Sequence, residues 1–296
     1  MKLNKYQEQF IKRVLDHAEK MHNEGNKEIA AMLKTIKENN NSLLIEVGRI
    51  LLDYDIIEER LKLTPGQIKA EFDKLGNLIK YSVKDEIESE ISTTGDFLKY
   101  VTTSTWYNSS YLLSIGIDFR LKKITSKQMA SIINKTIKGK NYSDRIWCNK
   151  NEIAKTLQMN IKNFLEGKIS VNDIKNTINA ISNANAFNTK RLIRNEIGRV
   201  QADVNEVWAK EHGIEYQLFD ATLDNRTSSM CQNYDGKVYR IDDKDKPIPN
   251  VNTHICCRSC LISIPSKDYR PSTKRDNISK EIIQYKTYSE WKEQNK

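Results

Sequence analysis

The chain has 296 residues, of which 38% are hydrophobic and 29% are charged, so it is long enough for two domains and a sizeable core. No run of eighteen apolar residues occurs and the N-terminus lacks the apolar core of a signal peptide, which argues against a membrane-spanning helix and a secretory leader. The five cysteines, an odd number that includes the adjacent Cys256 and Cys257, argue against a disulfide framework and predict synthesis in a reducing cytoplasm.

The net charge of +9 is concentrated in one part of the chain. Residues 1–119 carry 16 basic and 19 acidic side chains, whereas residues 120–175 carry 13 basic and 4 acidic ones. Such a segment attracts phosphate backbones without sequence selectivity, so we expect weak binding of double-stranded DNA. A solvated, lysine-rich helical face is the alternative. The lysines expected to contact DNA are Lys122, Lys123, Lys127, Lys135, Lys138 and Lys140.

The first third of the chain has the apolar spacing of helices. Apolar residues recur every three to four positions over residues 3–38, and Gly25 is expected to mark a break. A loop at 39–42 and a second helix over 43–62 are expected to follow. Thr64, Pro65 and Gln67 then form a helix-start signal, with Thr as the cap, and this helix is expected to end near Gly76.

The central part is also predicted to be helical. A basic helix is expected over 126–138, and a second helix is expected to be capped by Ser143 and ended by Gly167. Ser170 is expected to cap a short helix that reaches Ile181. A further helix over 188–212 carries Glu196 and Arg199 three residues apart, which predicts a pair on the helix surface.

The helical pattern stops between Asp220 and Pro265, where four of the five cysteines lie. Strands are expected at 215–219, 237–241 and 261–264, with a turn at Asp235-Gly236 and a basic, polar tail after 265. The predicted fold is therefore mainly α, with an extended multi-helix N-terminal and central region and a small C-terminal α+β module. The expected divisions are a helical region 1–119, a basic helical region 120–187, the module 188–265 and the tail 266–296.

The C-terminal stretch contains candidate metal ligands. Cys231, His254, Cys257 and Cys260 have side chains that suit a tetrahedral, structural zinc site, in which Cys256 could replace Cys257 or Cys260. A small module with few large apolar side chains needs a stabilising cross-link, which a bound metal ion can provide. The alternative is a set of reduced, buried thiols with one hydrogen-bonded histidine.

Three further residues are expected to act structurally. Asp224, Arg226 and Arg258 suit an internal ion pair that ties the two halves of the module together, because a guanidinium can bind a carboxylate with two hydrogen bonds. A metal-dependent hydrolase would need an open metal position and a general base. Glutamate is absent between Tyr216 and Lys280, so we expect no catalytic residues here.

Several of these blocks match a known family pattern in order. They are Asp224-Asn-Arg226-Thr227, Cys231, Asp235-Gly236, His254-Ile-Cys-Cys257-Arg258-Ser259 and the turn Ser143-Asp-Arg145-Ile-Trp147. With them the chain resembles the phage Mu F-like head morphogenesis family, and the resemblance covers roughly residues 110–296. Ile255 stands where the family usually has proline, and Ser228 stands where many members have a cysteine.

The resemblance implies a bacteriophage or prophage minor head protein, a structural protein rather than an enzyme. It would act in head morphogenesis at the portal vertex and in DNA packaging or ejection. Its expected partners are the portal protein, procapsid components and DNA, and its expected location is the virion after synthesis in the host bacterial cytoplasm. Two alternatives are a cytoplasmic zinc-dependent DNA-binding protein and a toxin or nuclease. The latter is disfavoured because only about thirty residues follow Pro265, too few for an effector domain.

Overall fold

The structure is a computed structural model that describes residues 5–114, 122–264 and 266–295. It divides into two compact units. The helical unit comprises residues 26–95 and 138–193, and the mixed unit comprises residues 1–25, 96–137 and 194–296. The prediction of a mainly α chain with a small C-terminal strand-containing module is confirmed. The four predicted divisions stay predictions, and the boundary expected between 119 and 120 lies outside the described residues.

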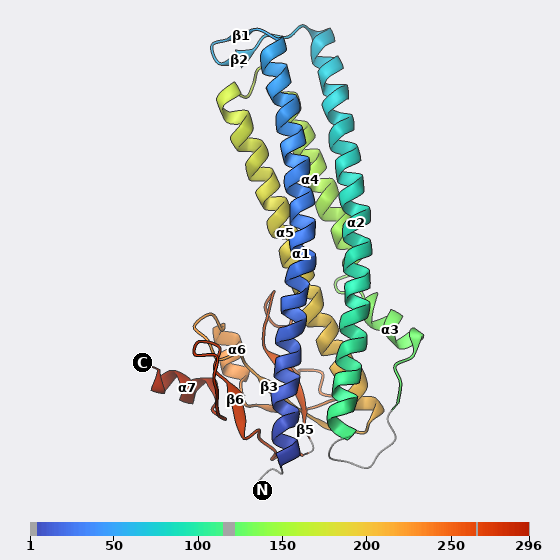
Figure 1. Cartoon of the computed structure of the whole chain (residues 1–296), viewed down its shortest axis with the longest axis vertical. Helices are drawn as coiled ribbons and strands as arrows, with labels where there is room; N and C mark the ends of the chain where they lie inside the picture. The colour runs from blue at the N-terminus through green and yellow to red at the C-terminus, as the bar shows by residue number, and fades with distance from the viewer. Residues whose placement is uncertain (1–4, 115–121, 265, 296) are drawn as a thin grey trace. The chain divides into compact units, whose positions relative to one another are not determined.

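Four long helices supply most of the structure: α1 (Lys5–Asp53), α2 (Pro65–Ser114), α4 (Tyr142–Leu165) and α5 (Val171–Glu211). In the helical unit they run side by side (Figure 1). The breaks expected at Gly25, 39–42, Gly76 and 182–187 are wrong, because helix continues through each of them. Asparagine usually favours loops by bonding its own backbone. Here Asn39 donates to Glu86 Oε1 at 2.7 Å and Asn40 donates to Asn179 Oδ1 at 2.9 Å, so packing between helices overrides that tendency.

The first helix ends earlier than predicted. After Asp53 the chain forms a small antiparallel hairpin of β1 (Ile56–Ile57) and β2 (Arg60–Leu61), whose turn residues Glu58 and Glu59 have positive φ angles. The helix predicted over 43–62 is therefore too long, because it ends at Asp53 and two short strands follow it. The predicted cap that follows is confirmed: the Gln67 N–H donates to Thr64 Oγ1 at 3.4 Å, and Gln67 Oε1 accepts from the Thr64 N–H at 2.8 Å.

Helix α4 begins at a different cap from the one predicted. Asn141 accepts a hydrogen bond from the Asp144 N–H, and the Asp144 carboxylate accepts one from the Asn141 N–H, a reciprocal capping box. Ser143 lies in the first turn and donates to the Asn141 side chain. The predicted stop is confirmed, since α4 ends at Leu165 and Gly167 takes a φ of +69°.

A buried charge cluster lies inside the helical unit beside its apolar core. Lys150 is 1% exposed, and its ammonium lies 2.9 Å from both Glu86 and Glu90. It also donates to Asn185 at 2.9 Å and to Thr189 at 3.3 Å. One ammonium thus links α2, α4 and α5 within this unit. The apolar core comprises Leu43, Val47, Ile50, Leu61, Leu75, Ile79, Val83, Ile161, Phe164, Leu165, Ile174 and Ile178.

The mixed unit contains a three-stranded antiparallel sheet in the order β4-β3-β5. The strands are β3 (Tyr216–Asp220), β4 (Val238–Arg240) and β5 (Cys260–Ile264), and Asp220 pairs with Cys260 at the end of the register. Strand pairing in the predicted places is confirmed. The short helix α6 (Ser229–Tyr234) lies between β3 and β4 in the chain.

The segment after residue 265 is structured, which corrects the prediction of a polar tail. It forms β6 (Thr273–Arg275), β7 (Ile282–Gln284) and α7 (Tyr288–Gln294). Trp291 is 2% exposed and its Nε1–H donates to Asp276 Oδ2 at 2.8 Å. The buried apolar residues of this segment, such as Tyr288 and Trp291, do not form a long helical or strand periodicity in the sequence. Contacts with distant residues such as Leu223 therefore order it.

A buried guanidinium ends the helix α3 (Ser126–Ile133). Arg199 is fully buried and donates to the carbonyls of Ile132 at 2.8 Å and Ile133 at 3.1 Å. It is also paired with Glu196 at 2.7 Å and Asp203 at 2.9 Å. The predicted surface pair of Glu196 and Arg199 is therefore a core pair, and the helix predicted to reach 138 stops five residues earlier because Arg199 binds its last carbonyls.

No helix in the part of the chain that the structure describes has both the length and the apolar character that crossing a bilayer requires.

The Lys150 cluster generates a stability prediction. Lys150→Ala leaves Glu86 and Glu90 buried without their counter-charge, so we expect the free energy of unfolding to fall by about 3–5 kcal/mol in urea titrations followed by circular dichroism. The exposed Lys155 on the same helix provides the matched control, and Lys155→Ala is expected to change stability by less than about 0.5 kcal/mol. Equal midpoints for the two variants would contradict the prediction.

Candidate metal centre

Cys231 is fixed in the mixed unit by the start of helix α6. Ser228 caps this helix, and its side chain accepts a hydrogen bond from the Cys231 N–H at 3.3 Å. The cap explains the serine at a position where the resembled family often has cysteine, because its side chain closes the helix end. Cys231 itself is 1% exposed.

A loop held by Asn250 presents the other two candidate ligands. Asn250 Nδ2 donates to the Cys257 carbonyl at 2.9 Å, and the Cys257 N–H donates to Asn250 Oδ1 at 2.8 Å. Asn250 has a φ of +63°, a conformation that asparagine tolerates better than most residues. A Cβ at Gly198 of α5 would collide with the Asn250 amide, so the glycine makes room for this loop.

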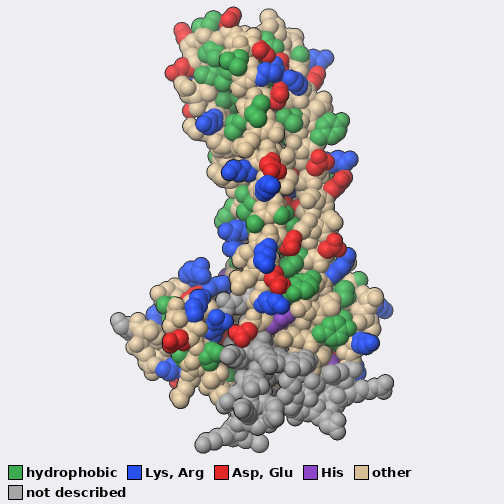
Figure 2. All heavy atoms as spheres, in the orientation of Figure 1, with side chains coloured by type: hydrophobic (Ala, Val, Ile, Leu, Met, Phe, Trp, Pro, Cys, Tyr) green, Lys and Arg blue, Asp and Glu red, His purple; other side chains and the backbone are tan. Residues whose placement is uncertain are grey.

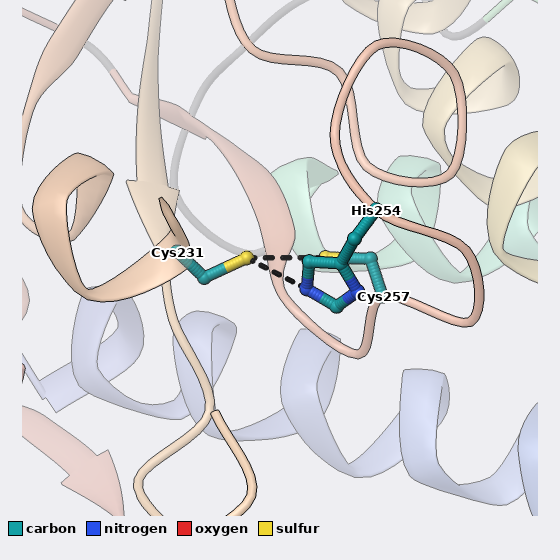
Figure 3. Close-up of side chains that lie close together, drawn as sticks. All are labelled: Cys231, His254 and Cys257. Carbon is teal, nitrogen blue, oxygen red and sulfur yellow. Dashed lines mark hydrogen bonds between the residues drawn. The ribbon is translucent and has the colours of Figure 1, made fainter. Parts of the chain in front are cut away.

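The three side chains converge on one point (Figure 3). Cys231 Sγ lies 3.1 Å from His254 Nε2 and 3.4 Å from Cys257 Sγ, and all three ligand atoms lie within 4.8 Å of one another. Around a tetrahedral zinc ion, sulfur–nitrogen and sulfur–sulfur separations are about 3.5 and 3.8 Å. Small outward shifts of the side chains would therefore open the cluster to a zinc ion, so the residues fit the metal.

The cluster also favours the thiolate form that a metal requires. A hydrogen bond from the Cys257 thiol is the main cause that lowers the pKa of Cys231 to about 5, and bonds from Ser228, Ser259 and His254 add to it. The same contact raises the pKa of Cys257, because that thiol keeps the proton which the pair shares. A divalent cation between the two sulfurs would displace this remaining proton.

The fourth predicted ligand does not join this group. Cys260 begins β5, beside Asp220 in the strand register, and burial raises the pKa of its thiol. Among the described residues, the group of possible ligand atoms contains Cys231, His254 and Cys257. Cys256 lies on the wall of the neighbouring cavity, and its N–H donates to Asn195 Oδ1 at 3.3 Å.

Asp224 and Arg258 form a two-bonded ion pair beside the cluster. Both terminal nitrogens of Arg258 donate to the Asp224 carboxylate, one of them at 2.9 Å. Burial works against ionisation of Asp224, but the bonds from Arg258 and the Arg226 N–H outweigh it and lower the pKa of the carboxyl. The Arg226 side chain does not lie inside the module, as the predicted internal ion pair requires. It is 81% exposed, and its guanidinium lies 3.9 Å from the Asp224 carboxylate.

A cavity of about 230 Å³ opens against the cluster. Two of the ligand residues, Cys231 and His254, are on its wall, and so is Arg226. Its remaining lining residues are Thr222, Thr227, Ile255, Cys256, Arg258 and Ser259.

The lysines predicted to bind DNA fall in both units. Lys122, Lys123, Lys127 and Lys135 belong to the mixed unit, and Lys138 and Lys140 belong to the helical unit. All six are exposed, but Lys122 pairs with Glu211 at 3.0 Å and Lys135 pairs with Asp203 at 2.5 Å. Lys140 lies 3.1 Å from Cys148 Sγ. The face in Figure 2 shows basic and acidic side chains interspersed over the long helices.

Sequence reasoning missed the residues that support the ligands. Gly198 gave no signal and Asn250 gave only a weak one, because their roles depend on the approach of α5 to a loop some fifty residues further along the chain. Ser228 was visible only as a departure from a family pattern. An Asn followed four residues later by His254 in a proline-containing loop is the one local hint of a constrained turn.

Comparison with known proteins gives one relative. Over an alignment that covers 91% of its length, the chain is 26% identical to a protein of Enterococcus faecalis named NAD(+)–arginine ADP-ribosyltransferase EFV. The chain spans about 60% of that relative's length. No family model matches the chain, and no solved structure matches it.

This comparison contradicts the identification as a phage head morphogenesis protein. It also contradicts the expected structural role in head assembly and DNA ejection and the expectation that the protein is not an enzyme, because the relative is named as an enzyme. The matching blocks have a physical explanation of their own: Asp224 and Arg258 pair, Cys231 and His254 converge, and Asp235 is buried. Such blocks specify a folded module, and one module can serve proteins of different function. The expected portal, procapsid and virion associations are untested and stay predictions.

The geometry of the cluster predicts the metal content. We expect purified protein to carry about one equivalent of zinc by elemental analysis. His254→Ala and Cys257→Ser are each expected to release the metal and to make the mixed unit more sensitive to proteolysis, because ligand binding also stabilises the fold. Cys148→Ser is the control, since Cys148 lies in α4 of the helical unit. Loss of zinc in Cys260→Ser would contradict the three-residue site and favour the four-ligand set.

The lysine segment yields a separate prediction for DNA. We expect weak duplex binding whose log–log salt dependence flattens by about 0.9 for each phosphate-contacting lysine removed. The variant replaces all six predicted lysines by glutamine and is followed by fluorescence anisotropy. Its matched control replaces six exposed lysines of the helical unit: Lys34, Lys37, Lys62, Lys69, Lys80 and Lys84. If both variants alter the slope equally, the predicted segment has no special role.

Proposed function

We propose that this chain acts in NAD(+)-dependent ADP-ribosylation of arginine side chains. The observation that carries the proposal is the similarity to NAD(+)–arginine ADP-ribosyltransferase EFV, which extends over 91% of the chain and therefore includes residues of both units. The chain covers 60% of the relative. We therefore propose the relative's activity for this chain and do not assign it from the similarity alone.

The proposed reaction exchanges one glycosidic bond for another. The bond between the nicotinamide nitrogen and ribose C1′ of NAD(+) breaks, and a bond forms between C1′ and a guanidine nitrogen of arginine. Nicotinamide leaves with the bonding electron pair, and the arginine nitrogen loses a proton to solvent or to a base. Positive charge that develops at the ribose is stabilised by carboxylates in comparable glycosyl transfers.

The cavity beside the cluster does not provide such a carboxylate. Among the described residues on its wall, none is an aspartate or a glutamate, and Asp224 nearby is held by Arg258. The proposed transferase activity is therefore supported by the sequence similarity and not by the cluster, to which we assign a structural role. We propose that Cys231, His254 and Cys257 bind zinc and that the ion stabilises the module against unfolding.

The transfer reaction is tested with the full chain, zinc-loaded and folded by circular dichroism. The protein is incubated with NAD(+) and agmatine, a small guanidine acceptor, and products are separated and weighed by mass spectrometry. We expect agmatine-dependent release of nicotinamide and a product whose mass equals agmatine plus ADP-ribose. The matched reaction contains an alkylamine in place of agmatine and is expected to give no adduct, because it lacks the guanidine. Folded protein that forms no agmatine adduct would contradict the proposed function.

A further inference from the structure

We propose that the metal site is open, and that its fourth position takes a phosphoryl oxygen held jointly by the metal and Arg226. The inference rests on metal binding by Cys231, His254 and Cys257, and it does not require transferase activity. It changes the site expected from the sequence, a closed structural centre with four protein ligands, into a centre that binds an exogenous anion.

The ligand count leaves a position free. Three of the possible ligand atoms in the described residues meet at one point, whereas a tetrahedral ion takes four. The Cys260 sulfur is outside the group and is placed by the strand register beside Asp220. The Asp224 carboxylate accepts two bonds from Arg258 and one from the Arg226 N–H, so it cannot turn to the metal without breaking them.

The free position faces the cavity rather than packed protein. Cys231 and His254 are both on the wall of the 230 Å³ space, so an ion bound to them borders it. A volume of that size holds several atoms beyond one water molecule, whose share of liquid volume is about 30 Å³. A ligand larger than water can therefore reach the metal.

The charges on the wall select an anion. Two thiolates neutralise a divalent ion, and the charge of Arg258 is balanced by Asp224. The Arg226 guanidinium lies 3.9 Å from Asp224 and is 81% exposed, so it retains its positive charge and donors on the cavity wall. A guanidinium on the wall of a cavity that a metal ion borders suits a phosphoryl group, which offers several oxygens to both.

The hydroxyl groups on the cavity wall indicate which chemical group of a ligand would bind there. The hydroxyl of Thr222 donates to the Arg258 carbonyl at 3.0 Å, and that of Thr227 donates to the Thr222 carbonyl at 2.5 Å. Neither threonine hydroxyl has a proton left for a ligand, and the Ser259 hydroxyl hydrogen-bonds to Cys231. The attraction consequently comes from the metal, whose fourth position takes an oxygen donor, and from the positive charge of Arg226. Inorganic phosphate and the diphosphate of a dinucleotide share this chemistry.

The test uses the full chain with Co²⁺ in place of zinc, because Co²⁺ reports its ligands in the absorption spectrum. We expect a sulfur-to-cobalt charge-transfer band typical of two thiolates, and d–d bands that shift saturably when phosphate is added. Arg226→Gln is expected to weaken the apparent phosphate affinity about tenfold or more, because a charge-assisted contact is lost. The matched control is Arg240→Gln, which removes an exposed arginine paired with Asp242 and is expected to leave the titration unchanged.

The outcomes separate the possible failures. Absence of cobalt uptake overturns the metal site together with this inference. Cobalt that binds but whose d–d bands ignore millimolar phosphate overturns the open position alone. Cys256→Ser or Cys260→Ser that lowers the charge-transfer intensity by about a third also overturns it, since a third thiolate would close the site. A titration with NAD(+) then identifies the source: a shift at lower concentration than phosphate requires assigns the site to a dinucleotide, and a shift with phosphate alone assigns it to the free ion.

Discussion

The C-terminal module depends on one buried carboxylate, that of Asp235. It accepts hydrogen bonds from the Ala221 N–H after β3 and the Tyr288 N–H at the start of α7, both at 2.6 Å. It also pairs with the buried ammonium of Lys274 on β6, at 2.8 and 3.0 Å. Lys274 in turn lies 3.1 Å from Asp220. A carboxylate with this many partners holds three separate segments together. Removing it would leave two buried N–H groups unsatisfied and would leave Lys274 with Asp220 as its counter-charge.

The metal cluster is built on the same frame. Asp235 caps the end of α6, the helix that carries Cys231, and Cys257 comes three residues before β5, the strand that pairs with β3. His254 and Cys257 therefore approach Cys231 because the sheet and the Asn250 loop are already in place. Binding of an ion by these three residues would add to the stability that the sheet and the Asn250 loop supply.

The difference between the resemblance and the relative follows from what short motifs encode. Asp224, Arg258 and the Asp235-Gly236 turn make contacts that a small module needs to stay folded, whatever the protein around it does. A motif of this kind is informative about local geometry and carries little about substrate. The similarity over 91% of the chain includes residues of both units, and the relative that it identifies is named as an enzyme.

Several features were determined by local chemistry and could be predicted from the sequence. The mainly α class, the Thr64 cap, the stop at Gly167, the strands of the C-terminal sheet and the convergence of Cys231, His254 and Cys257 on a candidate metal site all follow from residue type and spacing. A cap is satisfied by its own neighbours, and a glycine with positive φ costs little wherever it occurs, so neither needs the rest of the fold.

Tertiary structure alone decided where helices continue and which polar residues are buried. Asn39 and Asn40 stay helical because partners on other helices accept their amide protons, and Arg199 ends α3 from a distance of more than sixty residues in sequence. Asp235 was visible only as part of a turn, and Lys150 as one lysine among many. Whether a charged side chain faces water or a buried partner depends on contacts between distant segments, whose positions no local pattern encodes. For the same reason Cys260 could be named as a ligand by spacing, while the strand register placed its sulfur outside the group.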